Sequence, residues 1–174
     1  VLGGFRYYDR KEVKDMMAYM RLVQNPFDDL SMERIINVPK RGIGEKTVEK
    51  LKTLAAIRGE SLFQTLMDQE ILSGLASKSG KSLWEMVEIL HQFSLEKDNL
   101  KVSDIYDGLL VQTGYLKDLE KQNTIESETK IENLLEFKSV IYDYEKEKED
   151  ANEMGSLGDF MESIALMAEV DNHK

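Results

Sequence analysis

VPKRGIGEKTVEKLK, residues Val38–Lys52, holds two glycines next to basic residues and directly before a helical pattern. Gly42 and Gly44 can adopt backbone angles that other residues avoid, so a phosphate group can come close to the main chain. The first N–H groups of the following helix lack partners within that helix and carry partial positive charge. An anion is favoured at such a helix start. The segment therefore predicts a binding site for a nucleic-acid backbone.

Apolar residues with helical spacing flank this turn on both sides. Met32 and Ile35 precede it, and Val48 and Leu51 follow it, which predicts a helix-hairpin-helix over residues 31–58. No helix here is lined with residues that read base edges, so binding would not depend on DNA sequence. The alternative is a tight turn between two packed helices whose charges are merely solvated. The residues expected to meet phosphate are Lys40, Arg41, Gly42, Ile43, Gly44 and Lys46.

Helical patterns continue through most of the chain, which predicts an all-α fold in one compact multi-helix domain. Only residues 1–8 alternate like a short strand, and Asp9 with Glu12 has the spacing of a capping box. The acidic segment 145–158 lacks periodicity, and its middle is predicted to be a mobile loop rather than a binding tail. Helices are expected over residues 10–24, 45–58, 62–69, 82–95, 103–112, 116–122, 127–144 and 156–168.

Two further cations, Lys14 and Arg21, lie on the first predicted helix. They are seven residues apart, or two helical turns, so they point the same way and could straddle one strand of a DNA backbone. A solvated helix face is the alternative explanation for such a pair.

Charge is distributed unevenly along the chain. The net charge is −10, which argues against a protein whose whole surface binds DNA. Val38–Lys52 nevertheless holds five basic and two acidic residues, whereas Asp143–Lys174 holds three basic and ten acidic residues. A duplex should meet the first region and be repelled by the second.

Composition excludes several kinds of site. The chain has no cysteine, which rules out disulfides, zinc fingers and thiol nucleophiles. His91 and His173 are the only histidines and are far apart in sequence, so neither a catalytic nor a metal site is predicted. No apolar run approaches membrane-spanning length and no signal peptide is visible, so we expect a soluble cytoplasmic protein that does not contact a membrane. A P-loop for ATP is also missing, so this chain alone should not hydrolyse nucleotide.

Three motifs, in order, resemble one known family. GGFRYYDRKEVKDMMAYMRL at residues 3–22, INVPKRGIG at residues 36–44 and TKIENLLEF at Thr129–Phe137 are similar to the 2B subdomain of UvrD/PcrA/Rep-type superfamily 1A DNA helicases. The resemblance spans essentially the whole chain and is greatest to the PcrA branch of Gram-positive bacteria. Three separated motifs in the family order make it much more specific than the turn alone.

The resemblance implies a function for a part rather than for a complete enzyme. The 2B subdomain is an insertion in a motor domain, so residues 1–8 would be a strand and hinge of that domain, residues 9–170 the helical subdomain and residues 171–174 the returning hinge. Its two ends should therefore lie close together. ATP and Mg²⁺ would bind to the parent 3′-to-5′ helicase and not to this fragment, which would be inactive alone and monomeric.

By similarity, the partners would be the duplex DNA backbone and the motor domains of the same helicase. Thr47 joins the turn residues, and Lys14 and Arg21 match basic positions that touch the duplex. The family's 2B subdomain also swivels as a rigid body, which regulates unwinding.

Two other functions fit parts of the sequence. A protein-interaction or autoinhibitory module would bind a partner, or the same helicase, through an acidic face or an apolar groove, with little DNA affinity. A DNA glycosylase with a helix-hairpin-helix would place a catalytic lysine such as Lys50 or Lys52 soon after the turn.

Overall fold

The structure, a computed structural model, describes residues 8–172 and confirms the predicted all-α class, because this part of the chain contains helices and no strand. The strand predicted for residues 1–8 lies outside the described residues except at Tyr8, which is helical. The helices are α2 (Lys11–Gln24), α3 (Asp29–Ile35), α4 (Glu45–Arg58), α5 (Leu62–Leu66), α6 (Gln69–Ser73), α7 (Ser77–Glu96), the short 3-10 helix η1 (Lys97–Asn99), α8 (Val102–Gln112), α9 (Tyr115–Gln122), α10 (Ile125–Asp150) and α11 (Leu157–Asn172).

Helix α2 is the centre of the fold, since α3, α7, α8, α10 and α11 all pack against it. Its apolar residues are buried, as the spacing predicts, and even Tyr19 is fully enclosed. The capping box predicted at its start is wrong. Arg10 is the N-cap and its side chain caps nothing, while Glu12 is buried and accepts a hydrogen bond from Asn133 Nδ2 at 2.7 Å. Tertiary packing has thus drawn Glu12 into the core.

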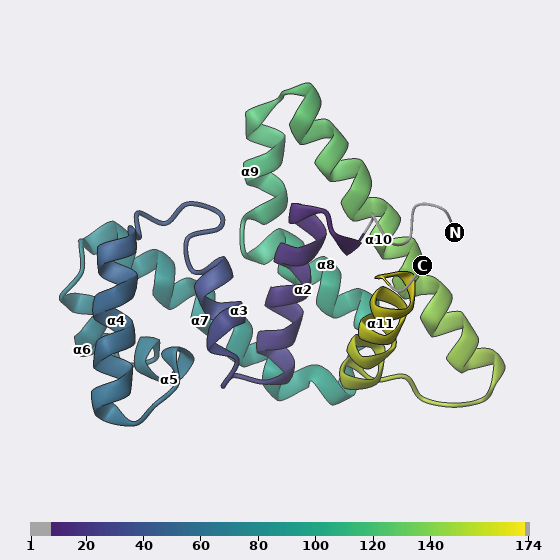
Figure 1. Cartoon of the computed structure of the whole chain (residues 1–174), viewed down its shortest axis with the longest axis horizontal. Helices are drawn as coiled ribbons and strands as arrows, with labels where there is room; N and C mark the ends of the chain where they lie inside the picture. The colour runs from purple at the N-terminus through teal and green to yellow at the C-terminus, as the bar shows by residue number, and fades with distance from the viewer. Residues whose placement is uncertain (1–7, 173–174) are drawn as a thin grey trace.

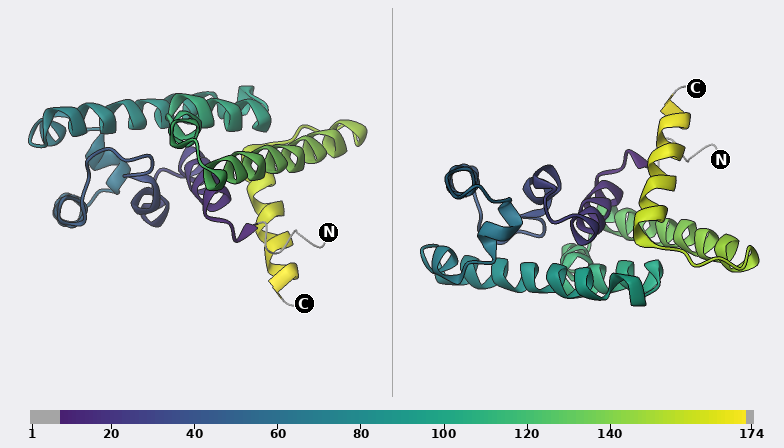
Figure 2. Two further views of the ribbon diagram at one scale, coloured as in Figure 1. Left: turned by 90° about the horizontal axis from the view of Figure 1, so that it is seen from above. Right: turned by 90° about the horizontal axis from the view of Figure 1, so that it is seen from below.

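The helices form two layers along the long axis of the molecule. Helix α7 runs along one side, and α2 to α5 lie on the other side of it (Figure 2). The helix predicted over residues 82–95 is confirmed within α7, and five apolar residues at helical spacing on it are buried. They are Leu83, Met86, Val87, Leu90 and Phe93.

Helix α10 is longer than predicted, because it continues to Asp150 instead of ending at residue 144. Residues 151–156, in the middle part of the acidic segment, form the non-helical connection to α11. Of the two adjacent leucines in α10, Leu135 is 60 % exposed, while Leu134 is buried. Successive helical residues face different directions, so only one of the two can enter the core.

The described ends of the chain lie at one end of the molecule, and α4 to α6 lie at the other (Figure 1). Tyr8 and Ala168 line the same small cavity, so the start of the described chain lies close to the last part of α11. Helix α11 extends through residues 171–172, where a hinge was predicted, and residues 173–174 lie outside the described part. Within residues 8–172, no helix combines the length and hydrophobicity of a membrane span.

A buried carboxylate joins three helices in the core. Asp15 of α2 is 1 % exposed and accepts hydrogen bonds from Arg34 Nε of α3 at 2.9 Å and from Tyr115 Oη of α9 at 2.7 Å. Lys11 Nζ approaches it at 3.0 Å. Burial, and then the adjacent Asp15 charge, raise the pKa of the Tyr115 hydroxyl, which therefore stays protonated and donates.

We predict that Asp15→Ala lowers the free energy of unfolding by about 3 kcal/mol, since it leaves Arg34 and Tyr115 without their buried acceptor. Urea denaturation would measure the loss. Asp9→Ala is the control, because the Asp9–Lys14 pair is exposed and 3.9 Å long, and it should cost no more than about 0.5 kcal/mol. Equal losses for both variants would contradict the structural role of Asp15.

Candidate nucleic-acid interface

The glycine turn, residues 37–44, connects α3 to α4 and is organised around one side-chain oxygen. Asn37 Oδ1 accepts hydrogen bonds from the main-chain N–H groups of Arg41 at 2.6 Å and Ile43 at 3.1 Å. Ile43 then inserts into the core and is only 3 % exposed. The amides of Arg41 and Ile43 are therefore occupied, whereas no hydrogen bond within the described residues uses those of Gly42 and Gly44.

Arg41 lies beneath the turn instead of on its surface, with 8 % of its area exposed. Its Nη1 lies 2.7 Å from the carbonyl oxygen of Ile35 and 3.2 Å from that of Ile36, at the end of α3. Its Nη2 donates to Tyr19 Oη at 2.7 Å, and this hydroxyl donates in turn to the carbonyl of Val38. The guanidinium predicted to meet phosphate is therefore bound to internal acceptors.

Burial is the main reason that the pKa of Tyr19 is raised, although the positive charge of Arg41 acts in the opposite direction. Tyr19 is consequently a neutral hydroxyl that both accepts from Arg41 and donates to the turn. Helix α2 thereby sets the position of the turn from below.

Gly42 is required by the conformation of the turn. Its φ of +74° lies in the left-handed region, and a Cβ atom here would come within 2.6 Å of Ser79 Oγ on α7. Gly44 has an ordinary φ of −86° and open space around it. The two glycines thus have different roles: Gly42 allows the bend and Gly44 leaves the surface uncovered.

The outer surface of the turn carries free donors and positive charge. Lys40, Gly42, Gly44 and Lys46 are exposed, and Thr47 is half-buried. Gly44 is the N-cap of α4 and provides no side-chain cap, so the first amides of α4 remain open to a ligand. Among the described residues, no protein group bonds to the amides of Gly42 or Gly44. This arrangement fits a phosphate oxygen.

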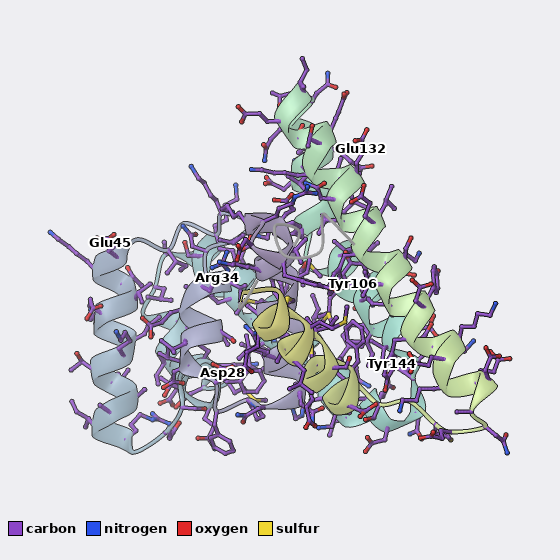
Figure 3. The ribbon with its side chains drawn as sticks, turned by 45° about the vertical axis from the view of Figure 1, so that its right-hand side comes forward. Asp28, Arg34, Glu45, Tyr106, Glu132 and Tyr144 are labelled. Atoms are coloured by element: carbon purple, nitrogen blue, oxygen red, sulfur yellow. The ribbon has the colours of Figure 1, made fainter. Side chains whose placement is uncertain are left out.

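Lys14 and Arg21 share one surface, as their spacing predicts. Both line a cavity of about 230 Å³ together with Arg34, Met17 and Asp9. Figure 3 labels Arg34 on α3, the helix that leads into the glycine turn. Arg34 is neutralised by Asp15, and Lys14 lies 3.9 Å from Asp9, so Arg21 is the cation of this group for which the described residues provide no ion-pair partner.

Lys50 and Lys52, the two lysines named in the glycosylase alternative, lie on α4. Lys52 lies 3.2 Å from Glu33, and the hydrogen bond to Glu33 is the main reason that its pKa is raised. A lysine held in its protonated form is a poor nucleophile. Lys50 is exposed on α4, and the described residues contain no cluster of His, Asp and Glu able to hold a metal ion. The glycosylase alternative therefore receives no support from this geometry.

Three residues that shape the site were not identified from the sequence. They are Asn37, Tyr19 and Ser79, which lie in the turn, on α2 and on α7. An Asn just before a Gly-rich turn is a usable local signal, because its side chain commonly bonds to nearby amides. The other two act across long separations in sequence, for which the local pattern has no signal.

Comparison with known proteins identifies relatives over nearly the whole chain. Residues 1–174 match the family described as UvrD-like helicase C-terminal domain. Proteins named ATP-dependent DNA helicase PcrA are 37 % identical in Bacillus subtilis (strain 168) and 39 % identical in Staphylococcus epidermidis, over 98 % of this chain in both cases. The chain spans only 22 % and 23 % of the length of these two relatives.

We predict that Arg41→Ala destabilises the chain by about 3 kcal/mol, because it removes a buried cation and leaves the carbonyls at the end of α3 without donors. Urea denaturation followed by circular dichroism measures this. Lys40→Ala changes the adjacent exposed cation and should have an effect within about 0.5 kcal/mol. If the two variants were equally stable, Arg41 would not be the internal support described above.

Proposed function

Because the chain belongs to the UvrD-like helicase C-terminal domain family, we propose that it is the 2B subdomain of an ATP-dependent 3′-to-5′ DNA helicase, where it binds duplex DNA and regulates unwinding. The observation that supports this most strongly is the glycine turn, in which the Gly42 and Gly44 amides have no bonding partner among the described residues and the adjacent lysines are exposed. In this proposal ATP, Mg²⁺ and the motor domains belong to the rest of the cytoplasmic helicase. The fragment itself contributes contacts and no catalysis.

The proposed contact is made by main-chain donors assisted by side-chain charge. The amides of Gly42 and Gly44, with those of the first turn of α4, would receive one phosphate group, and Lys40 and Lys46 would neutralise its neighbours. The Thr47 hydroxyl is near enough in sequence to add a donor. Contacts of this kind fix the position of the duplex without reading its sequence.

Arg41 has a different part in this proposal from the one expected from the sequence. Its guanidinium supports the turn from inside, while the exposed lysines provide the charge that reaches DNA. Ile43 similarly anchors the turn in the core. A turn held from below is preorganised, so little conformational entropy is lost when a phosphate binds.

Lys14 and Arg21 would form a second contact with the same duplex. They lie on α2, which is joined to the turn through Tyr19 and Arg41. Because both contacts belong to one packed unit, the duplex would be held at two places by a rigid body. A rigid arm of this type could regulate a motor by swivelling about the two closely placed chain ends.

We predict that Lys40→Ala/Lys46→Ala makes duplex binding less dependent on salt, with the slope of log affinity against log salt reduced by about 1.8, or roughly 0.9 for each lost phosphate contact. Fluorescence anisotropy with a labelled DNA duplex at several salt concentrations measures the slope. Lys117→Ala/Lys121→Ala removes two exposed cations from α9 and is the matched control. The same slope for both double variants would contradict the proposed contact.

Gly44→Ala separates binding from folding. Its φ and surroundings accept a methyl group, so the loss of stability should not exceed about 1 kcal/mol, the usual scale of an N-cap change. The methyl group would nevertheless stand between the amides and a phosphate, and duplex affinity should fall about tenfold, the loss of roughly one charge-assisted hydrogen bond. Anisotropy and urea denaturation on the same sample test both parts. Unchanged affinity would mean that the duplex does not approach the main chain at Gly44.

A further inference from the structure

A second surface, which the proposed function does not use, lies between α10 and α11. It is a groove of about 650 Å³, within the range of sites that bind ligands and peptide anchors. Its floor is apolar and includes Val140, Phe160, Ile164 and Met167. Met167 is 49 % exposed, so the groove presents an accessible hydrophobic surface. We call it the acidic groove, because its rim carries more carboxylates than cations.

The walls of the acidic groove are fixed by aromatic and polar contacts. The rings of Tyr144 and Phe160 pack edge to face with centroids 5.2 Å apart, and the Tyr144 hydroxyl donates to Asp159 Oδ2 at 2.7 Å. Tyr144 is labelled in Figure 3, where α10 and α11 lie next to each other. The groove is therefore preformed, and no binding free energy is spent on opening it.

The rim of the groove has four carboxylates and two cations. Lys148 lies 3.4 Å from Asp159, and Arg10 lies 3.9 Å from Glu136. For Asp143 and Glu147 the described residues provide no cationic partner. These two acids are both exposed and are four residues apart on α10, so they stand one turn apart along the same rim.

The helices that line the acidic groove, α10 and α11, lie on the other side of the molecule from α4, the helix that follows the glycine turn (Figure 1). Negative charge around the groove would repel a nucleic acid, so the same class of ligand cannot serve both surfaces. A ligand that fits this groove would have the opposite charge to DNA. It would carry apolar groups to contact the floor and cations to contact the rim.

We propose that the acidic groove is a docking site for a basic amphipathic helix of a partner protein. The apolar face of such a helix would lie on Val140, Ile164 and Met167. Lysine or arginine residues one turn apart on its flank would pair with Asp143 and Glu147. Helix-in-groove recognition combines these two features, with apolar anchors giving affinity and charges giving orientation.

The direct test uses the 174-residue chain and a fluorescent amphipathic peptide of about 18 residues built from leucine and lysine, long enough to form a helix. A peptide with glutamate in place of lysine and one with scrambled order are the ligand controls. Of the three peptides, we expect only the leucine–lysine peptide to show saturable binding. If that peptide did not bind, or if either control bound as tightly, the proposal would be overturned.

Matched variants locate the binding. Asp143→Lys/Glu147→Lys and Met167→Glu should each weaken the peptide about tenfold or more, through lost charge pairing and through a charge on the apolar floor. Glu128→Lys/Glu132→Lys makes the same charge change at the same spacing on α10, outside the groove, and Leu166→Glu alters the exposed neighbour of Met167. These controls should bind like the unmodified chain. Equal weakening by test and control variants would show non-specific attraction and refute the site.

The two proposals can fail separately. Lys40→Ala/Lys46→Ala should leave peptide binding unchanged, and Asp143→Lys/Glu147→Lys should not weaken duplex binding. Loss of peptide binding in the turn variant would contradict an independent groove, whatever the DNA result. Circular dichroism of each variant confirms that the helices are intact.

Discussion

The cation of Arg41, buried under the glycine turn, is the interaction on which the candidate interface depends. A helix ends with carbonyl groups that have no partner inside the helix, and a positive charge near that end is favoured. Arg41 meets both needs at the end of α3 and also binds Tyr19 of the central helix. One side chain thus couples the end of α3, the turn and α2. The conformation of the turn is therefore set by contacts on its inner side.

The sequence was sufficient for the helices and for the position of the turn, but not for its construction. The stripe from Leu83 to Phe93 has the helical period and is buried, because burial of one face is what produces that period. Arg41 has a basic side chain in an exposed-looking segment, and its burial depends on Tyr19, 22 residues earlier. Glu12 likewise has the spacing of a cap but is held in the core by Asn133. The burial of Arg41 and Glu12 depends on partners far away in the sequence. A local sequence pattern carries no information about such partners.

The two proposed binding surfaces are connected through helices that are joined by buried polar contacts. Asp15 connects α2 with α3 and α9, so the helix that carries Lys14 and Arg21 is fixed relative to the one that leads into the turn. The same α2 supports α11, which forms one wall of the acidic groove. Such a core suits a unit that moves as a whole. In a larger helicase, such a unit would act through its position relative to the other domains.

The basic turn precedes α4, whereas the acidic groove lies between α10 and α11, so these two charged surfaces are separated in the molecule. In the field of a polyanion such a separation would produce a torque that turns the basic turn toward the polyanion before any contact forms. Capture from solution then requires fewer random collisions, and added salt shortens the distance over which the rotation acts. The overall charge of −10 would repel a polyanion. Because the positive charge is gathered at the turn, a polyanion could still approach the molecule from that side.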